Sequence, residues 1–353
     1  MWRQREIWMV MAASLSLGLF GVLLVVWGNP ENSGICVSCF LENSAGALGL
    51  HGNERMQYLR PELIGFVLGA TGSSLFFREF RSRGGTSPMG RLVAGFFLIV
   101  GCAVFIGCPI KLFLRLTAGD LTALLALGGL GAGVWIGLRG LSAGVHFGAS
   151  TPQRGGAGLV VPALFALLLV FLVVKPSFVL FSDRGSAAEH APLLLSLGAG
   201  LLLGALAQRS RFCITGGLRD GMLLGLRAPL LWGLLAFVLA AALANLSIGR
   251  FEPGFYGQPG AHLDHVWSFL GMLLVGWISA LIGGCPFRQL VKSGEGDTDA
   301  GMVVFGMLIG AAVVQGWGLA GTAAGVPFYG KVAVLVGLGL VLLTGLVMRE
   351  RTV

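Results

Sequence analysis

The chain carries the same reactive tripeptide twice, half its own length apart. Gly107-Cys108-Pro109 recurs 177 positions later as Gly284-Cys285-Pro286, in a chain of 353 residues. A cation follows each cysteine by three positions, Lys111 in the first copy and Arg288 in the second. Duplicated sites of this kind are typical of transporters built from two internal repeats. The pattern therefore predicts a two-fold path for a small anion.

The residue types in each copy suit the binding of an anion. Proline is favoured at the first position of a helix, so the cysteine before it is predicted to lie at the N-cap. Free backbone N–H groups and the helix dipole favour negative charge there, and Lys111 or Arg288 adds to that field. Gly107 and Gly284 remove side-chain bulk, so that a ligand can approach the backbone. A helix break with a small buried cysteine would explain one copy, but the duplication favours a functional site.

Three further cysteines extend the pattern. Cys36 and Cys213 are also 177 positions apart, and Cys36 forms a Cys-x-x-Cys motif with Cys39. A metal site would need two more ligands, and His51 is a weak candidate, so we predict no metal and no cofactor. Oxidation of this dithiol at the outer face stays open as an alternative. Cys102 lies inside an apolar run and is predicted to be a core thiol.

Apolar segments must hold these residues in a membrane. Hydrophobic residues make up 55% of the chain and charged residues 11%, and apolar runs of about 18 residues can cross a bilayer as helices. We predict an all-α polytopic membrane protein with about ten transmembrane helices, at 7–27, 61–77, 92–107, 121–138, 158–174, 191–207, 229–247, 266–283, 301–320 and 331–348. Four interrupted segments are predicted to be re-entrant, at 31–50, 108–119, 210–225 and 285–297.

The predicted spans divide into two repeats within one integral membrane domain, residues 1–176 and 177–353. Five spans in each repeat, an odd number, predict that the second repeat is inverted relative to the first. With a cytoplasmic N-terminus, 16 of the 24 Lys and Arg residues face the cytoplasm. The positive-inside rule thus places both termini in the cytoplasm, at a bacterial-type inner membrane. The net charge of +8 reports this orientation, and we predict no nucleic-acid partner.

Several motifs carry a resemblance to a known family. They run from about residue 28 to the C-terminus and include Gly28-Asn29-Pro30, Arg60-Pro61-Glu62, Gly107-Cys108-Pro109, Gln208-Arg209-Ser210-Arg211, Gly257-Gln258-Pro259 and Gly284-Cys285-Pro286. Together these motifs resemble the YeeE/YedE sulphur-transport family, and more closely its YedE-type branch, which is linked to selenium transport. The resemblance implies an inverted-repeat transporter that takes up thiosulfate through a relay of cysteines. By motif, Cys108 and Cys285 match the central relay thiols, Cys213 an inner thiol, and Cys36 or Cys39 the outer thiol.

The predicted function is a membrane permease for a small selenium- or sulfur-containing anion, such as selenite or thiosulfate, and not an enzyme. The expected partners are this anion, the lipid bilayer and a cytoplasmic selenium- or sulfur-handling protein. One alternative is a membrane thiol protein that performs redox or chalcogen-transfer chemistry for selenium metabolism. Another is a scaffold that delivers selenium without transporting it. The choice between selenium and sulfur rests on the resemblance, and the oxidation state, energy coupling and oligomeric state stay open.

Inward movement of an anion works against a negative cell interior. At a potential of ~100 mV each charge costs ~2.3 kcal/mol, so a dianion costs ~4.6 kcal/mol. The predicted spans contain no acidic pair that indicates a proton relay, so we expect facilitated uptake drawn by consumption of the anion inside. Four cations of the first repeat are predicted to collect anions at the outer mouth, namely Arg55, Arg60, Lys111 and Arg115.

Overall fold

Long helices make up most of the chain, whose residues 2–347 are described by a computed structural model. The long helices are α1 (Trp2–Val26), α3 (Pro61–Phe76), α4 (Pro88–Phe105), α6 (Ala123–Ser142), α7 (Gly155–Val174), α8 (Leu193–Ser210), α10 (Pro229–Ser247), α11 (His265–Ile282), α13 (Thr298–Gly316) and α14 (Phe328–Val347). Within residues 2–347, nine helical stretches are long and apolar enough to cross a membrane, while α3 has only 16 residues. The predicted all-α polytopic membrane fold is confirmed.

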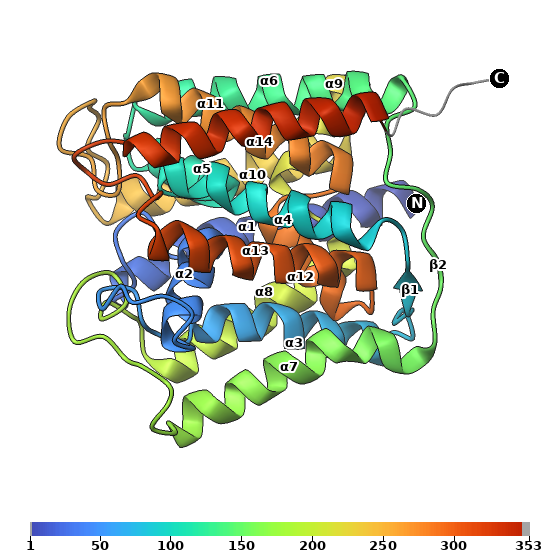
Figure 1. The fold of residues 1–353 in the computed structure, drawn as a ribbon, viewed down its shortest axis with the longest axis horizontal. Coiled ribbons are helices and arrows are strands. Elements are labelled where there is room, and N and C mark those ends of the chain that lie inside the picture. The colour runs from blue at the N-terminus through green and yellow to red at the C-terminus, as the bar shows by residue number, and fades with distance from the viewer. Residues whose placement is uncertain (1, 348–353) are drawn as a thin grey trace.

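Short helices occupy the four segments predicted to be too interrupted to span. They are α2 (Val37–Ala47), α5 (Pro109–Thr117), α9 (Ile214–Leu224) and α12 (Pro286–Gly294). The bounds of α2, α4 and α5 each recur 177 positions later as the bounds of α9, α11 and α12. Figure 1 shows α2 and α5 toward one end of the helix bundle and α9 and α12 toward the other. The predicted inverted repeat would produce this arrangement.

The long helices pack in pairs that join the two halves of the chain. α1 packs mainly on α10, α3 on α8, α4 on α13, and α6 on α11. Small residues allow these close approaches, as expected for helices in lipid. At Gly129 of α6, for example, a Cβ atom would lie 2.1 Å from the carbonyl oxygen of Phe269 in α11. The predicted repeats 1–176 and 177–353 therefore share their helix interfaces, and the boundary between them stays a prediction.

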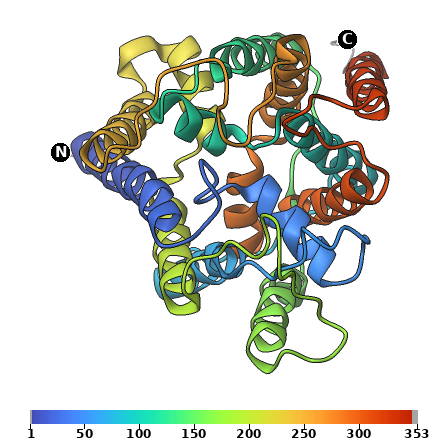
Figure 2. The ribbon, with the colours of Figure 1, turned by 90° about the vertical axis from the view of Figure 1, so that its left-hand side faces the viewer.

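The remaining elements connect helices at the ends of the bundle. Two short strands, β1 (Arg83–Gly84) and β2 (Thr151–Pro152), pair antiparallel, and a 3₁₀ turn, η1 (Gly225–Arg227), precedes α10. These strands lie at the end of the bundle where α1 begins and α14 ends (Figure 1). The view from the opposite end shows the connections that surround α2 (Figure 2).

The outer faces of the bundle are apolar. α7 and α14 lie at its periphery and expose many leucine and valine side chains, including Leu167, Val173, Leu335 and Leu342. Exposed apolar surface on this scale needs lipid rather than water around it. The chain is accordingly a multi-pass membrane protein.

Candidate functional site

Both Gly-Cys-Pro motifs begin short helices, as predicted. Cys108 and Cys285 are the N-cap residues of α5 and α12, with extended backbone conformations, and a proline follows each at the first helical position. The carbonyl oxygen of Cys108 accepts a hydrogen bond from the Leu112 N–H at 3.0 Å, and that of Cys285 accepts one from Gln289 at 3.1 Å. Each thiol therefore lies at the positive end of a helix dipole.

Two cysteines from different helices form a pair that we call the inner thiols, Cys213 and Cys285. Their sulfurs lie 3.5 Å apart, and the backbone N–H of Cys285 donates to the Cys213 sulfur at 3.4 Å. Cys213 is the N-cap residue of α9, and the hydroxyl of Thr215 lies 3.2 Å from its sulfur. Both thiols are almost completely buried. Two helix N-termini thus converge on one thiol pair.

Three cysteines form a second group that we call the outer thiols, Cys36, Cys39 and Cys108. The Cys36 and Cys39 sulfurs lie 2.9 Å apart, and the Cys108 thiol faces Cys36. The ammonium nitrogen of Lys111 lies 4.0 Å from the Cys39 sulfur. The hydroxyl of Ser38 lies 3.4 Å from the Cys36 sulfur and corresponds to Thr215 of the inner group. The structure thus divides the five predicted site cysteines into two groups.

The two groups are connected through contacts between the short helices. α2, which carries outer thiols, contacts α12, and α5 contacts α9. Cys102 lies completely buried in α4, as expected of a core thiol.

The glycines before the cysteines also accommodate the cation that follows each of them, and the approach of a ligand to the backbone there stays a prediction. A Cβ atom at Gly107 would lie 2.6 Å from Cδ of Lys111, and one at Gly284 would lie 2.8 Å from Cγ of Arg288. Gly284 also has a φ of +154°, which side-chain-bearing residues rarely adopt. Each glycine therefore leaves room for the aliphatic part of the side chain that follows it, Lys111 after Gly107 and Arg288 after Gly284.

A cavity of about 270 Å³ lies beside the inner thiols. It is lined by Cys213, by Ser279 of α11 and by three arginines, Arg211, Arg219 and Arg288. Among the described residues that line it, none is acidic. The Ser279 hydroxyl is buried and has no hydrogen-bond partner among the described residues. Such a group is free to bind a ligand in the cavity.

Most of these lining residues were not identified from the sequence. An arginine at the edge of an apolar segment, such as Arg219, is typical of the membrane interface, and Ser279 lies within an apolar helix without any motif. One signal was available: Ser279 lies 177 positions after Cys102, and Arg219 lies 177 positions after Glu42. The offset marks positions that are equivalent in the two repeats.

Two arginines that precede Cys213 in the chain, Arg209 and Arg211, differ in their partners. Arg209 and Gln208 hydrogen-bond to Glu79, which follows α3. Hydrogen bonds from Gln208 and Arg209 lower the pKa of Glu79, and the charge of Arg211 contributes as well. Arg211 itself has no ion-pair partner among residues 2–347 in which side chains are placed. Its charge is therefore available to an anion.

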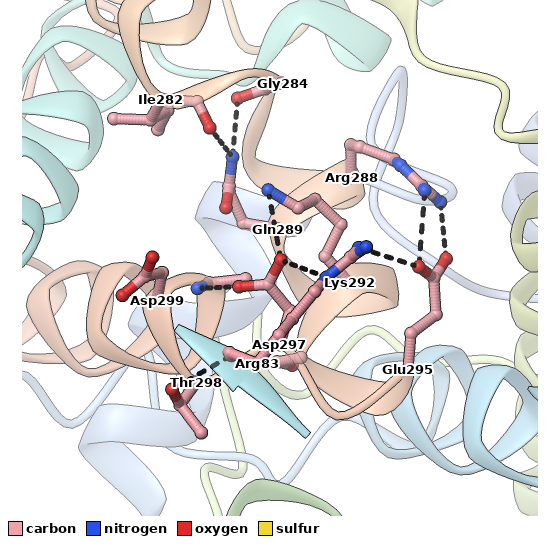
Figure 3. A network of polar contacts seen from close by, with 12 residues as sticks. Arg83, Ile282, Gly284, Arg288, Gln289, Lys292, Glu295, Asp297, Thr298 and Asp299 are labelled. Atoms are coloured by element: carbon pink, nitrogen blue, oxygen red, sulfur yellow. Dashed lines mark hydrogen bonds and ion pairs between the residues drawn. The ribbon is translucent and has the colours of Figure 1, made fainter. Parts of the chain in front are cut away.

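A network of ion pairs holds the turn that contains Cys285 (Figure 3). Arg288 pairs with Glu295 at 2.9 Å, and Lys292 pairs with Asp297 at 3.6 Å. The side-chain amide of Gln289 donates to the carbonyls of Ile282 and Gly284, at 3.3 Å and 3.2 Å. The backbone before the thiol is thereby fixed.

The corresponding turn of the first repeat is held by Arg115. Its guanidinium lies 2.6 Å from Asp120 and donates to the carbonyl of Phe105 at 3.1 Å. Arg60 is also completely buried, where it donates to Asn43 and stacks over the ring of Phe40. The prediction that Arg60 and Arg115 collect anions at the outer mouth is therefore wrong, because buried partners satisfy both side chains. Arg55 is exposed, and Lys111 lies beside the outer thiols.

A metal site at the Cys-x-x-Cys motif would need ligands beyond Cys36 and Cys39, for which the sequence offers His51 as a weak candidate. No group of three or more His, Cys, Asp and Glu side chains is arranged to hold a metal ion there. Both ring nitrogens of His51 are engaged, one with the carbonyl of Glu42 at 2.9 Å and the other with the N–H of Asn53 at 3.2 Å.

Comparison with known proteins agrees with this geometry. Residues 209–348 match the family described as sulphur transport. The match covers 140 of the chain's 353 residues. It is also 27% identical, over 126 residues, to the thiosulfate transporter TsuA of Escherichia coli (strain K12). That alignment covers 35% of this chain and 34% of TsuA, so the chain matches about a third of its relative's length.

The match to the sulphur transport family covers the whole inner site. Cys213, Cys285 and the arginines that line the cavity all lie within residues 209–348. The outer thiols precede this stretch and are related to the inner ones through the internal offset of 177 residues.

Proposed function

We propose that the protein is a permease that takes up a small sulfur-containing anion, such as thiosulfate, through a path lined by the outer and inner thiols. Thiosulfate has a soft terminal sulfur at one end and a hard oxyanion group at the other. In this proposal, the thiols contact the soft sulfur while arginine and hydroxyl groups hold the oxygens.

The inner cavity is the observation that carries the proposal. The Cys213 thiol and three guanidinium groups face the same space of about 270 Å³, together with the free hydroxyl of Ser279. Arg288 is buried and Arg219 half-buried, and a purely structural cavity in a membrane protein would gain nothing from these cations, because their desolvation is costly. An anion with a soft end matches both kinds of lining group.

The outer thiols would receive the anion first. Lys111 lies 4.0 Å from the Cys39 sulfur, and Cys36 lies between Cys39 and Cys108. We therefore assign the first contact to Cys39 and the next to Cys36, followed by Cys108. The proposal includes an inverted second repeat and cytoplasmic termini at an inner membrane, which would place the arginine-lined cavity on the cytoplasmic side.

The proposal includes selenite, a selenium oxyanion, as a second substrate. Selenite is likewise a small oxyanion built on a soft, polarizable atom, so it could use the same thiols and cations. A cytoplasmic protein that handles the released sulfur or selenium would complete the uptake.

Uptake into proteoliposomes tests the proposal. Radiolabelled thiosulfate and selenite are supplied to wild-type protein, to Cys285→Ala and to the control Ser196→Ala, which removes an equally buried small polar group of α8 that bonds to the Ala191 carbonyl. We expect wild-type and control uptake of at least one label, and a loss of about 10-fold or more in Cys285→Ala. Equal uptake by Cys285→Ala would refute the role of the thiol path. Loss of uptake in both variants would assign the effect to packing.

The short distances between thiols favour one alternative function, sulfur transfer. A Cys36 thiolate could attack the terminal sulfur of thiosulfate, forming a persulfide and releasing sulfite with its electron pair, so that atoms and charge balance. Cys39, 2.9 Å away, could then displace hydrosulfide and form a disulfide. Mass spectrometry of protein incubated with thiosulfate distinguishes the two functions. A permease remains unmodified, whereas the transfer reaction releases sulfite and leaves either a persulfide, heavier by one sulfur atom, or, after Cys39 has displaced hydrosulfide, a disulfide that is lighter by two hydrogens.

A further inference from the structure

A buried carboxylate lies next to the outer thiols. Glu42 follows Cys36 and Cys39 at intervals of three residues, so the three side chains lie along one side of α2. The residue is only 5% exposed, and Lys111 of α5 is only 3% exposed. Glu42 forms no salt bridge with a residue that the structure describes, Lys111 included. A buried acid and a buried base therefore border the same thiols without neutralising each other directly.

Gln315 and His51 hydrogen-bond to Glu42, and Asn53 hydrogen-bonds to both of them. The side-chain amide of Gln315 in α13 donates to Glu42 Oε2, and the carbonyl of the same amide accepts from Asn53 at 2.8 Å. His51 donates from Nε2 to the backbone carbonyl of Glu42, because its Nδ1 accepts the Asn53 N–H. An amide carries both a donor and an acceptor, so Gln315 could turn to accept a hydrogen bond from a protonated carboxyl group.

The other elements packed around α2 bring charged or titratable groups that already have partners. Arg60, the N-cap residue of α3, donates to Asn43, and Glu62 accepts from Asn29 through Oε1, while its Oε2 has no hydrogen-bond partner among the described residues. Arg288 and Lys292 of α12 pair with acids of their own turn, and Cys102 of α4 is a neutral buried thiol. The charge next to the outer thiols is thus set by Glu42 and Lys111.

This arrangement couples anion binding to proton binding. An ionised Glu42 and a charged Lys111 sum to zero, so a bound dianion would bring two unbalanced negative charges into a buried site. A proton on Glu42 removes one of them. Because linkage is reciprocal, a site that binds the anion more tightly when Glu42 is protonated must also bind the proton more tightly when the anion is present.

We propose that Glu42 takes up a proton when the anion binds at the outer thiols, so that the permease carries anion and proton together. This inference rests on the proposed function and replaces the expectation of uncoupled uptake. At ~100 mV one accompanying proton lowers the opposing concentration ratio for a dianion from about 2,000-fold to about 50-fold. The equivalent position in the second repeat is Arg219, which lines the inner cavity, so only the outer group carries this acid.

Calorimetric titration with thiosulfate tests the proposal in buffers that differ in ionisation enthalpy. The difference in heat gives the number of protons taken up per anion, measured at several values between about pH 5 and 8. Wild type is expected to reach a maximum near one proton. Glu42→Gln is expected to bind thiosulfate with no proton uptake, and the control Glu54→Gln, which removes an exposed carboxylate paired with Arg184, should match wild type.

The outcomes separate this inference from the proposed function. Wild-type binding without proton uptake, or unchanged proton uptake in Glu42→Gln, would refute the role of Glu42 while leaving the permease proposal intact. Absence of thiosulfate binding and uptake in the wild type would refute both. A Gln315→Met variant provides a second test that keeps the acid: loss of the amide donor should move proton uptake to higher pH, and an unmoved profile would contradict the proposal.

Discussion

Replacing Arg115 with methionine should reveal how the first Gly-Cys-Pro turn is held. The Arg115 and Asp120 side chains are 1% and 0% exposed and lie 2.6 Å apart. The same guanidinium donates to the carbonyl of Phe105 at 3.1 Å and to the hydroxyl of Thr122 at 2.8 Å. Methionine would fill much of the space but would leave Asp120 without its cation and the Phe105 carbonyl without a donor.

The expected loss of stability follows from these contacts. Removal of one partner of a buried ion pair costs about 3–5 kcal/mol, and the lost hydrogen bond to Phe105 adds about 1 kcal/mol. Asp120 keeps bonds from the backbone N–H and the hydroxyl of Thr122, at 2.9 Å and 2.6 Å. These bonds offset part of the penalty. We therefore expect Arg115→Met to lower the free energy of unfolding by about 4 kcal/mol.

The second repeat provides a matched comparison. Lys292 corresponds to Arg115, but its side chain is 17% exposed and lies 3.6 Å from Asp297. After Lys292→Met, Asp297 would retain Arg83 at 3.3 Å and the N–H of Ala300 at 2.8 Å. The expected loss is about 1–2 kcal/mol.

Reversible unfolding in mixed micelles measures all of these variants. The double variant Arg115→Met with Asp120→Leu should recover more than half of the stability lost by Arg115→Met, because it no longer buries an unpaired charge. The reasoning fails if Arg115→Met is less destabilising than Lys292→Met, or if the double variant is no more stable than the single one.

Three further predictions concern the inner cavity and the helix contacts. Ser279→Ala should weaken thiosulfate binding about 5- to 10-fold in calorimetric titration, since one hydrogen bond to a charged ligand is lost; unchanged affinity would exclude the hydroxyl from the site. Arg211→Gln should reduce uptake at low thiosulfate concentration, while Arg184→Gln, which removes an exposed arginine that pairs with Glu54 and does not line the cavity, should not; equal effects would indicate a general loss of surface charge. Gly129→Ala should lower the free energy of unfolding by about 1–3 kcal/mol, because the new Cβ would meet the Phe269 carbonyl; wild-type stability would show that the helices can separate freely.

Local signals in the sequence were sufficient for much of the fold. The predicted spans correspond to the long helices because apolar composition and length decide membrane crossing. Proline after each paired cysteine determined that α5 and α12 begin where predicted, with Cys108 and Cys285 at the N-caps. These features depend on residues that are adjacent in the chain.

The site required tertiary contacts that no local pattern supplies. A sequence cannot show whether Arg60 and Arg115 collect anions at the surface or bind buried partners inside the protein. The structure shows that both bind buried partners, Asn43 and Asp120. Ser279 became a candidate only when its hydroxyl was found beside the arginines of the cavity. The role of Glu42 also depends on contacts between distant parts of the chain. Gln315 hydrogen-bonds to its carboxylate, and Lys111 lies beside Cys39, three residues before Glu42 in α2.

The pairing of helices across the two halves has a consequence for biosynthesis. Four of the first-half helices find their main partners only in the second half, as α1 does with α10 and α4 with α13. While the ribosome is still making the second half, the glycine-lined faces of the first half lie open to lipid or to other newly made chains. The assembled bundle can therefore form only late in translation. During that interval the first half depends on lipid, or on an insertion chaperone, to keep its unpaired helices apart.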